Sequence, residues 1–94
     1  MRPLAALLLL AACASPAPAF MAATRTDVVV DGRSFAVFRE GNRAQVIRLG
    51  HATPQQRPAI PGQMLRAVAL ATGCTPLAAS FDGDSGERRG RITC

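Results

Sequence analysis

The dipeptide Asp31-Gly32 constrains the fold of this chain more than any other local feature of its sequence. It separates two apolar runs, and a two-residue loop of type I′ needs positive φ at both central residues, which Asp and Gly tolerate. The sequence therefore predicts a β-hairpin over residues 27–38, with Val28 opposite Phe35. Because side chains alternate along a strand, Val28, Val30, Phe35 and Val37 share the expected core face, and Val29, Ser34, Ala36 and Phe38 share the other.

The middle of the chain predicts a third strand and then one helix. A polar turn at 40–43 leads into the strand, residues 44–49, and residues 50–61 read as a loop. Residues 62–72 favour a helix, since Ala, Leu, Met and Gln are good helix formers and Gly73 follows as a stop. The stripe expected to lie on the sheet consists of Leu65, Val68, Ala69 and Thr72.

Two more strands are predicted, at 76–81 and 87–94, with a polar turn at 82–86 between them. One face of the first carries Leu77, Ala79 and Phe81; the second has Gly90, Ile92 and Cys94 on one face and Arg89, Arg91 and Thr93 on the other. The predicted fold class is α+β, a small antiparallel sheet of about five strands in the order β-β-β-α-β-β with one helix packed on it. A chain of 94 residues has room for one such domain.

The start of the chain has the layout of an export signal. Arg2 precedes an apolar stretch, residues 4–12, which is shorter than the roughly 20 residues a membrane-spanning helix needs. Leu10-Ala11-Ala12-Cys13 resembles the lipobox of bacterial lipoproteins, which implies cleavage before Cys13 and attachment of lipid to its sulfur. Ala17-Pro18-Ala19 offers an alternative cut, which would leave a plain secreted protein beginning at Phe20. We favour the first reading, with a signal peptide at 1–12, a lipidated Cys13 and flexible tether at 13–24, and the domain at 25–94.

The leader also explains an odd number of cysteines. Cys13 is lipidated or removed, so Cys74 and Cys94 remain as an even pair in an oxidising compartment. We predict a disulfide between them; it closes a loop of about 20 residues and stabilises the fold by roughly 3 kcal/mol in the chain-entropy account. A reactive redox pair is the alternative, which the lack of a C-x-x-C spacing disfavours.

Together with the lipobox, the segments Thr72-Gly73-Cys74 and Ile92-Thr93-Cys94 resemble the small, uncharacterised, cysteine-ended lipoproteins of alphaproteobacteria. The resemblance implies an outer-membrane lipoprotein facing the periplasm, because Ala14 stands where inner-membrane lipoproteins often carry Asp. Several acyl chains on Cys13 would give stable anchoring, whereas one chain is marginal. A soluble periplasmic or secreted protein is the alternative. The resemblance implies no activity, cofactor or catalytic residue.

Three patterns that suggest chemistry are weak. Gly83-Asp84-Ser85-Gly86 matches part of the motif around the nucleophile of chymotrypsin-like proteases, but Glu87 replaces the next Gly and the chain is too short for that fold. Asp82, Asp84 and Glu87 do not match the spacing of a calcium loop. His51 has no neighbouring His or Cys in the sequence. We therefore expect no catalytic residue, metal ligand or cofactor.

The positive charge of the chain comes from arginine alone. The sequence has 11 Arg, no Lys and six acids, and Arg88, Arg89 and Arg91 cluster on the last expected strand. Export and the lack of an aromatic stacking platform argue against nucleic acid. An anionic lipid headgroup or an acidic protein is the expected partner of these arginines, unless their number reflects GC-rich coding and solubility. The sequence favours a non-catalytic envelope lipoprotein with a structural or accessory role; an arginine-rich periplasmic binding module or inhibitor is the alternative.

Overall fold

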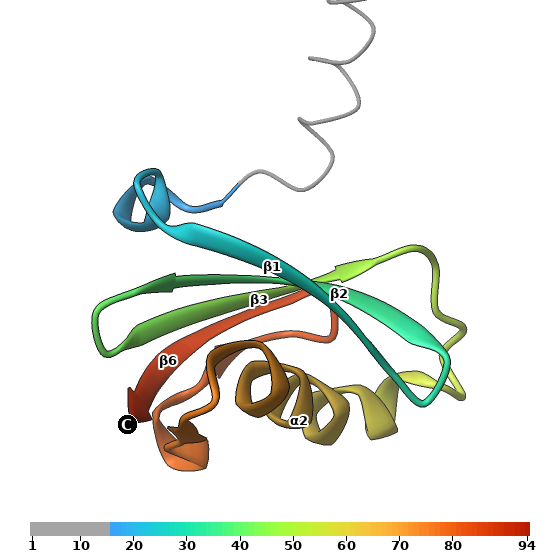
Figure 1. Ribbon diagram of the computed structural model, residues 1–94. Coiled ribbons are helices and arrows are strands. Elements are labelled where there is room, and N and C mark those ends of the chain that lie inside the picture. Colours follow the sequence, from blue (N-terminus) through green and yellow to red (C-terminus); the bar gives the residue numbers. More distant parts are fainter. Residues whose placement is uncertain (1–15) are drawn as a thin grey trace, which may run out of the picture.

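The hairpin forms as the sequence predicts. In the computed structural model, which describes residues 16–94, strands β1 (Thr24–Val30) and β2 (Arg33–Glu40) pair antiparallel with Val28 opposite Phe35 (Figure 1). Asp31 and Gly32 have φ of 51° and 76°, the left-handed values that this turn requires. The predictions for Cys13 and the leader lie outside the described residues.

A curled antiparallel sheet grows from this hairpin. Strand β3 (Arg43–Leu49) pairs with β2, and β6 (Glu87–Thr93) pairs with β3. Two short strands, β4 (Thr75–Pro76) and β5 (Asp82–Gly83), pair with the other side of β6, so the order is β1-β2-β3-β6-β4 with β5 also on β6. The predicted fold class, an antiparallel sheet with one helix on it, is confirmed.

The helix α2 (Ile60–Thr72) begins earlier than predicted and turns a different face to the sheet. The helix follows a 3-10 turn, η3 (Arg57–Ala59). Pro61 fits the first turn of the helix, because backbone N–H groups at that position have no partner within the helix and proline has no N–H to lose. It ends at Gly73, which has φ of 71° and donates its N–H to the Ala69 carbonyl at 2.9 Å. The buried side chains are Ile60, Gln63, Met64, Ala67 and Val68. Only Val68 of the predicted stripe is among them, since burial of Ile60 sets the phase of the helix.

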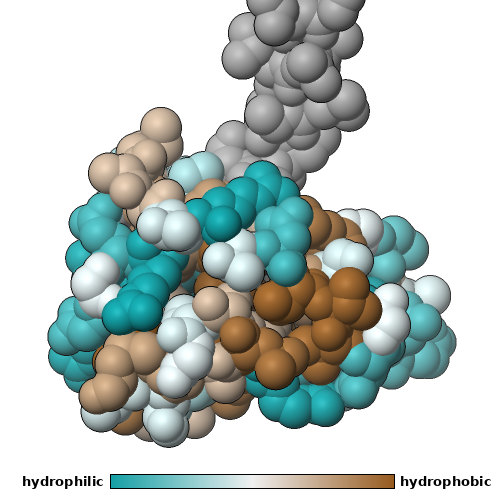
Figure 2. All heavy atoms as spheres, viewed as in Figure 1, coloured by the Kyte–Doolittle hydropathy of each residue, from teal (hydrophilic) through white to brown (hydrophobic). Residues whose placement is uncertain are grey.

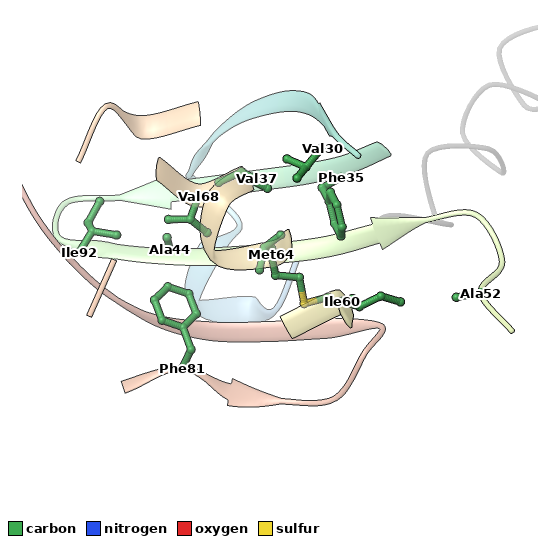
Figure 3. Packing of buried hydrophobic residues seen from close by; sticks show 12 residues of the cluster. Val30, Phe35, Val37, Ala44, Ala52, Ile60, Met64, Val68, Phe81 and Ile92 are labelled. Carbon is green, nitrogen blue, oxygen red and sulfur yellow. The ribbon is translucent and has the colours of Figure 1, made fainter. Parts of the chain in front are cut away.

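The main core lies between α2 and the sheet face that the hairpin pattern predicts (Figure 3). Phe35, Ile60 and Met64 are fully buried there, and the cluster also contains Val30, Val37, Ala44, Val46, Ala52, Ala67, Val68, Phe81 and Ile92. Apolar residues also gather on the surface around β1 and α2, with hydrophilic residues around them (Figure 2). The helix thus covers one face of the sheet and leaves the opposite face for another part of the chain.

The prediction of one strand over residues 76–81 is wrong. The chain makes only β4, then a 3-10 turn, η4 (Ala78–Ser80), and then β5. The Ser80 hydroxyl donates to the Leu77 carbonyl at 2.7 Å and accepts the Arg91 N–H at 2.8 Å, which stabilises the turn instead of a continuous strand. Phe81 then enters the core against Gly90, where a Cβ would overlap its ring, whereas Leu77 is exposed.

The disulfide Cys74–Cys94 is present, as predicted. Its cysteines are 20 residues apart, one just after α2 and the other just after β6. The bond therefore joins the end of the helix to the end of a central strand, across the two layers of the fold.

Candidate functional site

The N-terminal segment covers the sheet face opposite the helix. Its 3-10 turn, η2 (Pro18–Phe20), places Phe20 on this face with 1% exposure, against Ala36 and Phe38. Ala17, Ala23, Ile47 and Leu49 surround this second cluster. Residues 13–24 were expected to form a flexible tether. The structure differs at Phe20, which packs on the sheet and covers Phe38.

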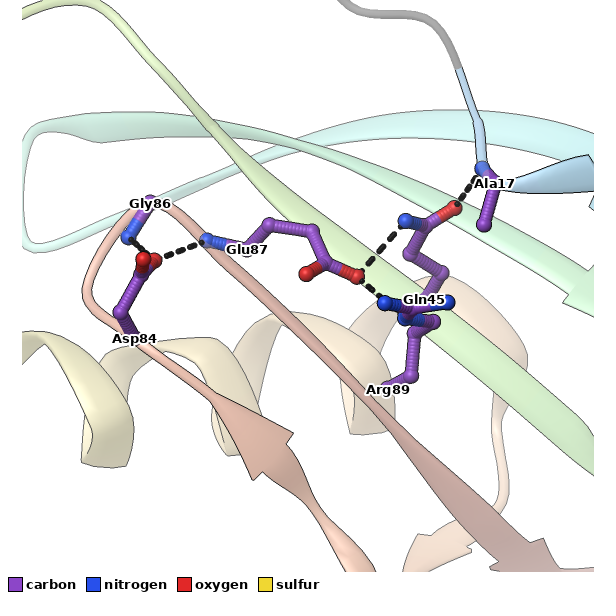
Figure 4. A network of polar contacts seen from close by, with 6 residues as sticks. All are labelled: Ala17, Gln45, Asp84, Gly86, Glu87 and Arg89. Carbon is purple, nitrogen blue, oxygen red and sulfur yellow. Dashed lines mark hydrogen bonds and ion pairs between the residues drawn. The ribbon is translucent and has the colours of Figure 1, made fainter.

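A polar network around the buried Gln45 holds the same segment on the sheet (Figure 4). Gln45 on β3 is only 3% exposed, and its Oε1 accepts the Ala17 N–H at 3.0 Å. Its Nε2 donates to Glu87 Oε2 at 2.7 Å, and the same oxygen pairs with Arg89 Nε at 2.8 Å. Both ends of the buried amide are therefore satisfied, which is the condition for a polar side chain to be stable in such a position.

Four arginines share this face with Phe20. Arg25 lies over the Phe38 ring, 5.7 Å from its centroid, and pairs with Asp27 at 2.8 Å. The Arg43 guanidinium lies over the Phe20 ring at 5.4 Å. Arg89 and Arg91 follow on β6, and Arg91 stands directly opposite Arg43 in the β3–β6 pairing.

Three of these arginines, but not Arg25, frame a cleft of about 350 Å³ between Phe20 and β6. It is lined by Phe20, Arg43, Ser80, Arg89, Gly90 and Arg91. Among the described residues, the side chains of Arg43 and Arg91 form no ion pair and no hydrogen bond, whereas Arg89 pairs with Glu87. Two of the three arginines in the cleft, Arg43 and Arg91, therefore have no acidic partner in the described part of the chain.

The predicted cluster of Arg88, Arg89 and Arg91 is divided by the sheet. Arg89 and Arg91 line the cleft, but Arg88 points to the helix side, where it donates to the carbonyls of Phe81 at 3.0 Å and Gly83 at 3.2 Å. The sequence reading missed Arg43 and Phe20 as members of this site. The strand alternation puts Arg43 on the right face, but only the β3–β6 register brings it to Arg91.

The loop at 82–86 is held by its own backbone. The Asp84 carboxylate accepts the N–H groups of Gly86 at 2.7 Å and Glu87 at 3.1 Å. These bonds lower the pKa of Asp84, the Gly86 bond most, because they stabilise its charged form. Ser85 contributes its carbonyl to Arg48 Nη1 at 2.8 Å. The geometry therefore shows a turn in which Asp84 has a structural role.

His51 lies beside the hairpin turn, away from the arginine cleft. It lines a separate hollow of about 400 Å³ with Asp31, Gly32, Arg33, Ser34, Leu49 and Gln56, and neither Asp82 nor Glu87 contributes to it. The Arg66 guanidinium holds the pKa of Asp31 below its usual value through a 2.7 Å hydrogen bond. No group of three or more potential metal ligands occurs within residues 16–94.

No helix in the part of the chain that the structure describes is long and apolar enough to cross a membrane. Comparisons of the chain with protein-family models, with curated proteins and with solved structures found no match.

Proposed function

We propose that this protein is a non-catalytic lipoprotein of the cell envelope, anchored through lipid on Cys13, with its small domain in a structural or accessory role at the membrane surface. The observation that carries the proposal is the docking of Ala17 and Phe20 on the sheet, a few residues after the sequence that resembles a lipobox. Four residue steps separate Cys13 from Ala17, which span at most about 14 Å at about 3.5 Å per residue. An anchor on Cys13 would keep the domain close to the bilayer.

The disulfide supports an exported location. Bonds of this kind form and persist in the periplasm or outside the cell, and thiols stay reduced in the cytosol. Cys74 and Cys94 are consumed by the bond, which leaves Cys13 as the one cysteine of the sequence that is available for another modification.

The docked segment also supports one of the two cleavage sites over the other. A cut after Ala19 would remove Ala17, whose N–H bonds to Gln45 Oε1 and whose carbonyl accepts the Phe20 N–H at 2.8 Å. A buried acceptor left without a donor costs about 1–3 kcal/mol. Cleavage before Cys13 retains all of these contacts, so the packing favours the lipoprotein reading over the secreted one.

Mass spectrometry of the intact protein from the membrane and soluble fractions of the producing cells tests the proposal. We expect the mass of residues 13–94 plus the acyl groups on Cys13, less two hydrogens for the disulfide. The Cys13→Ser variant is the matched control, and it should lose the acyl mass and leave the membrane fraction. A native protein that begins at Phe20 without any added mass would refute the proposal.

A further inference from the structure

We propose that the cleft between Phe20 and β6 binds a phosphate group, with Arg43 and Arg91 as its principal ligands and Arg89 as a third. Phosphate accepts several N–H donors at once, and the planar fork of arginine matches its oxygens in a bidentate manner. The volume of about 350 Å³ also leaves room for the remainder of a phosphate ester.

The register of the sheet is the first argument for an anion here. Arg43 and Arg91 stand directly opposite each other on β3 and β6, and side chains in that relation have Cβ atoms about 4.5–5.5 Å apart. Like charges in such a pair repel, which destabilises the strand pairing. A bound anion would convert the repulsion into two favourable contacts.

The aromatic ring below Arg43 is the second argument. Phe20 is fixed by its burial, and its face holds the Arg43 guanidinium at 5.4 Å. Such a contact restricts the side chain without consuming its N–H donors, so Arg43 is preorganised for a ligand. Recognition of an anion then costs less conformational entropy than it would on a free arginine.

The acids around the cleft do not neutralise this pair. Glu87 is paired with Arg89, and Asp82 stands opposite Arg89 on β5, at the other end of the site. Glu40 stands opposite Arg43 across the β2–β3 turn, yet the two form no ion pair, since the guanidinium lies over Phe20 instead. Positive charge therefore remains at the end of the cleft where the two arginines meet.

The test is a titration of the Cys13→Ser protein with inorganic phosphate and with glycerol phosphate, followed by NMR of the arginine Nε–H groups. The Cys13→Ser variant cannot carry lipid at residue 13, so the result is independent of the proposed anchor. We expect saturable shifts at Arg43, Arg89 and Arg91. The R43Q/R91Q variant should weaken binding by about tenfold or more, as expected for the loss of charge-assisted bonds.

The matched control is R57Q/R66Q, which removes two charges from the helix layer and should leave the affinity within about twofold. Equal shifts at every arginine, or equal weakening by both double variants, would overturn the proposal. If R43Q/R91Q does not fold, R91Q alone serves, because the Arg91 side chain is exposed and has no hydrogen bond among the described residues.

Vesicles distinguish the source of the phosphate. If the Cys13→Ser protein responds to soluble phosphate and also binds phosphatidylglycerol vesicles, and R43Q/R91Q does neither, the ligand is a lipid headgroup. If only the soluble esters bind, the ligand is a small phosphorylated compound, and the cleft assignment also stands. Vesicle binding without any response to soluble phosphate would show a diffuse electrostatic attraction, and the site would be rejected.

Discussion

Replacement of Phe20 by Ala tests whether the segment before β1 belongs to the folded domain. Phe20 is 1% exposed and packs on Ala36 and Phe38. A buried phenylalanine removes about 150–250 Å² from water, which at about 25 cal/mol per Å² corresponds to roughly 4–6 kcal/mol. Residual burial in the unfolded chain reduces that figure, and so does relaxation of the segment. We therefore expect Phe20→Ala to lower the free energy of unfolding by about 3 kcal/mol.

The measurement is urea denaturation of the oxidised protein in the Cys13→Ser background. Circular dichroism is the suitable signal, because the sequence has no Trp and no Tyr. Met21→Ala is the matched control: Met21 is the next residue and 72% exposed, so its loss should change stability by no more than about 0.5 kcal/mol. Hydrogen exchange shows where the structure is weakened: in Phe20→Ala, the N–H groups of Ala17 and Phe20 should exchange faster than those of β3. If both variants have the same stability as the parent, the segment is a tether and the docking argument fails.

Three further changes probe other contacts. Gln45→Leu should lower the free energy of unfolding in urea by about 1–3 kcal/mol, because the Ala17 N–H loses its acceptor and Glu87 loses a donor. Gln55→Leu, at an exposed loop residue, is the control, and equal effects of the two substitutions would contradict the network. Gly90→Ala should cost about 1–3 kcal/mol because its Cβ meets the Phe81 ring, whereas Gly62→Ala meets open space and should show no loss of thermal stability. The pKa of Asp84 is lowered in the fold, so its contribution is present above the unfolded value of about 3.9 and is lost as the pH falls through the folded value. Asp84→Asn should therefore reduce the difference in stability between pH 7 and pH 3, measured by urea denaturation at both pH values. A difference equal to that of the parent protein would count against the backbone hydrogen bonds to Asp84.

Local rules predicted the parts of the fold that local chemistry determines. The hairpin register follows from two turn residues, and the disulfide was predicted from the two cysteines that remain once Cys13 is assigned to the expected export signal. The phase of α2 could not be found in the same way, because it depends on Ile60, which lies in a segment that reads as a loop.

The candidate site depended still more on tertiary contacts. Phe20 follows a run of small residues and prolines with no periodicity, and only the open sheet face next to Phe38 makes its burial favourable. Arg43 and Arg91 are 48 positions apart in numbering, and their approach requires the pairing of two strands that are not consecutive. The alternation of β6 was predicted, and it does separate Arg88 from its two neighbours, but the membership of the cleft was beyond sequence reasoning.

Strand β1 has a consequence for the behaviour of the protein at high concentration. It stands first in the sheet order, so one row of its backbone donors and acceptors has no neighbouring strand within the described residues, and Val29 is 63% exposed. Free edges of this kind invite pairing between molecules, and charged side chains on them are a common protection against aggregation. Arg25 and Asp27 supply such charges on β1, so we expect their ion pair to oppose aggregation through this edge.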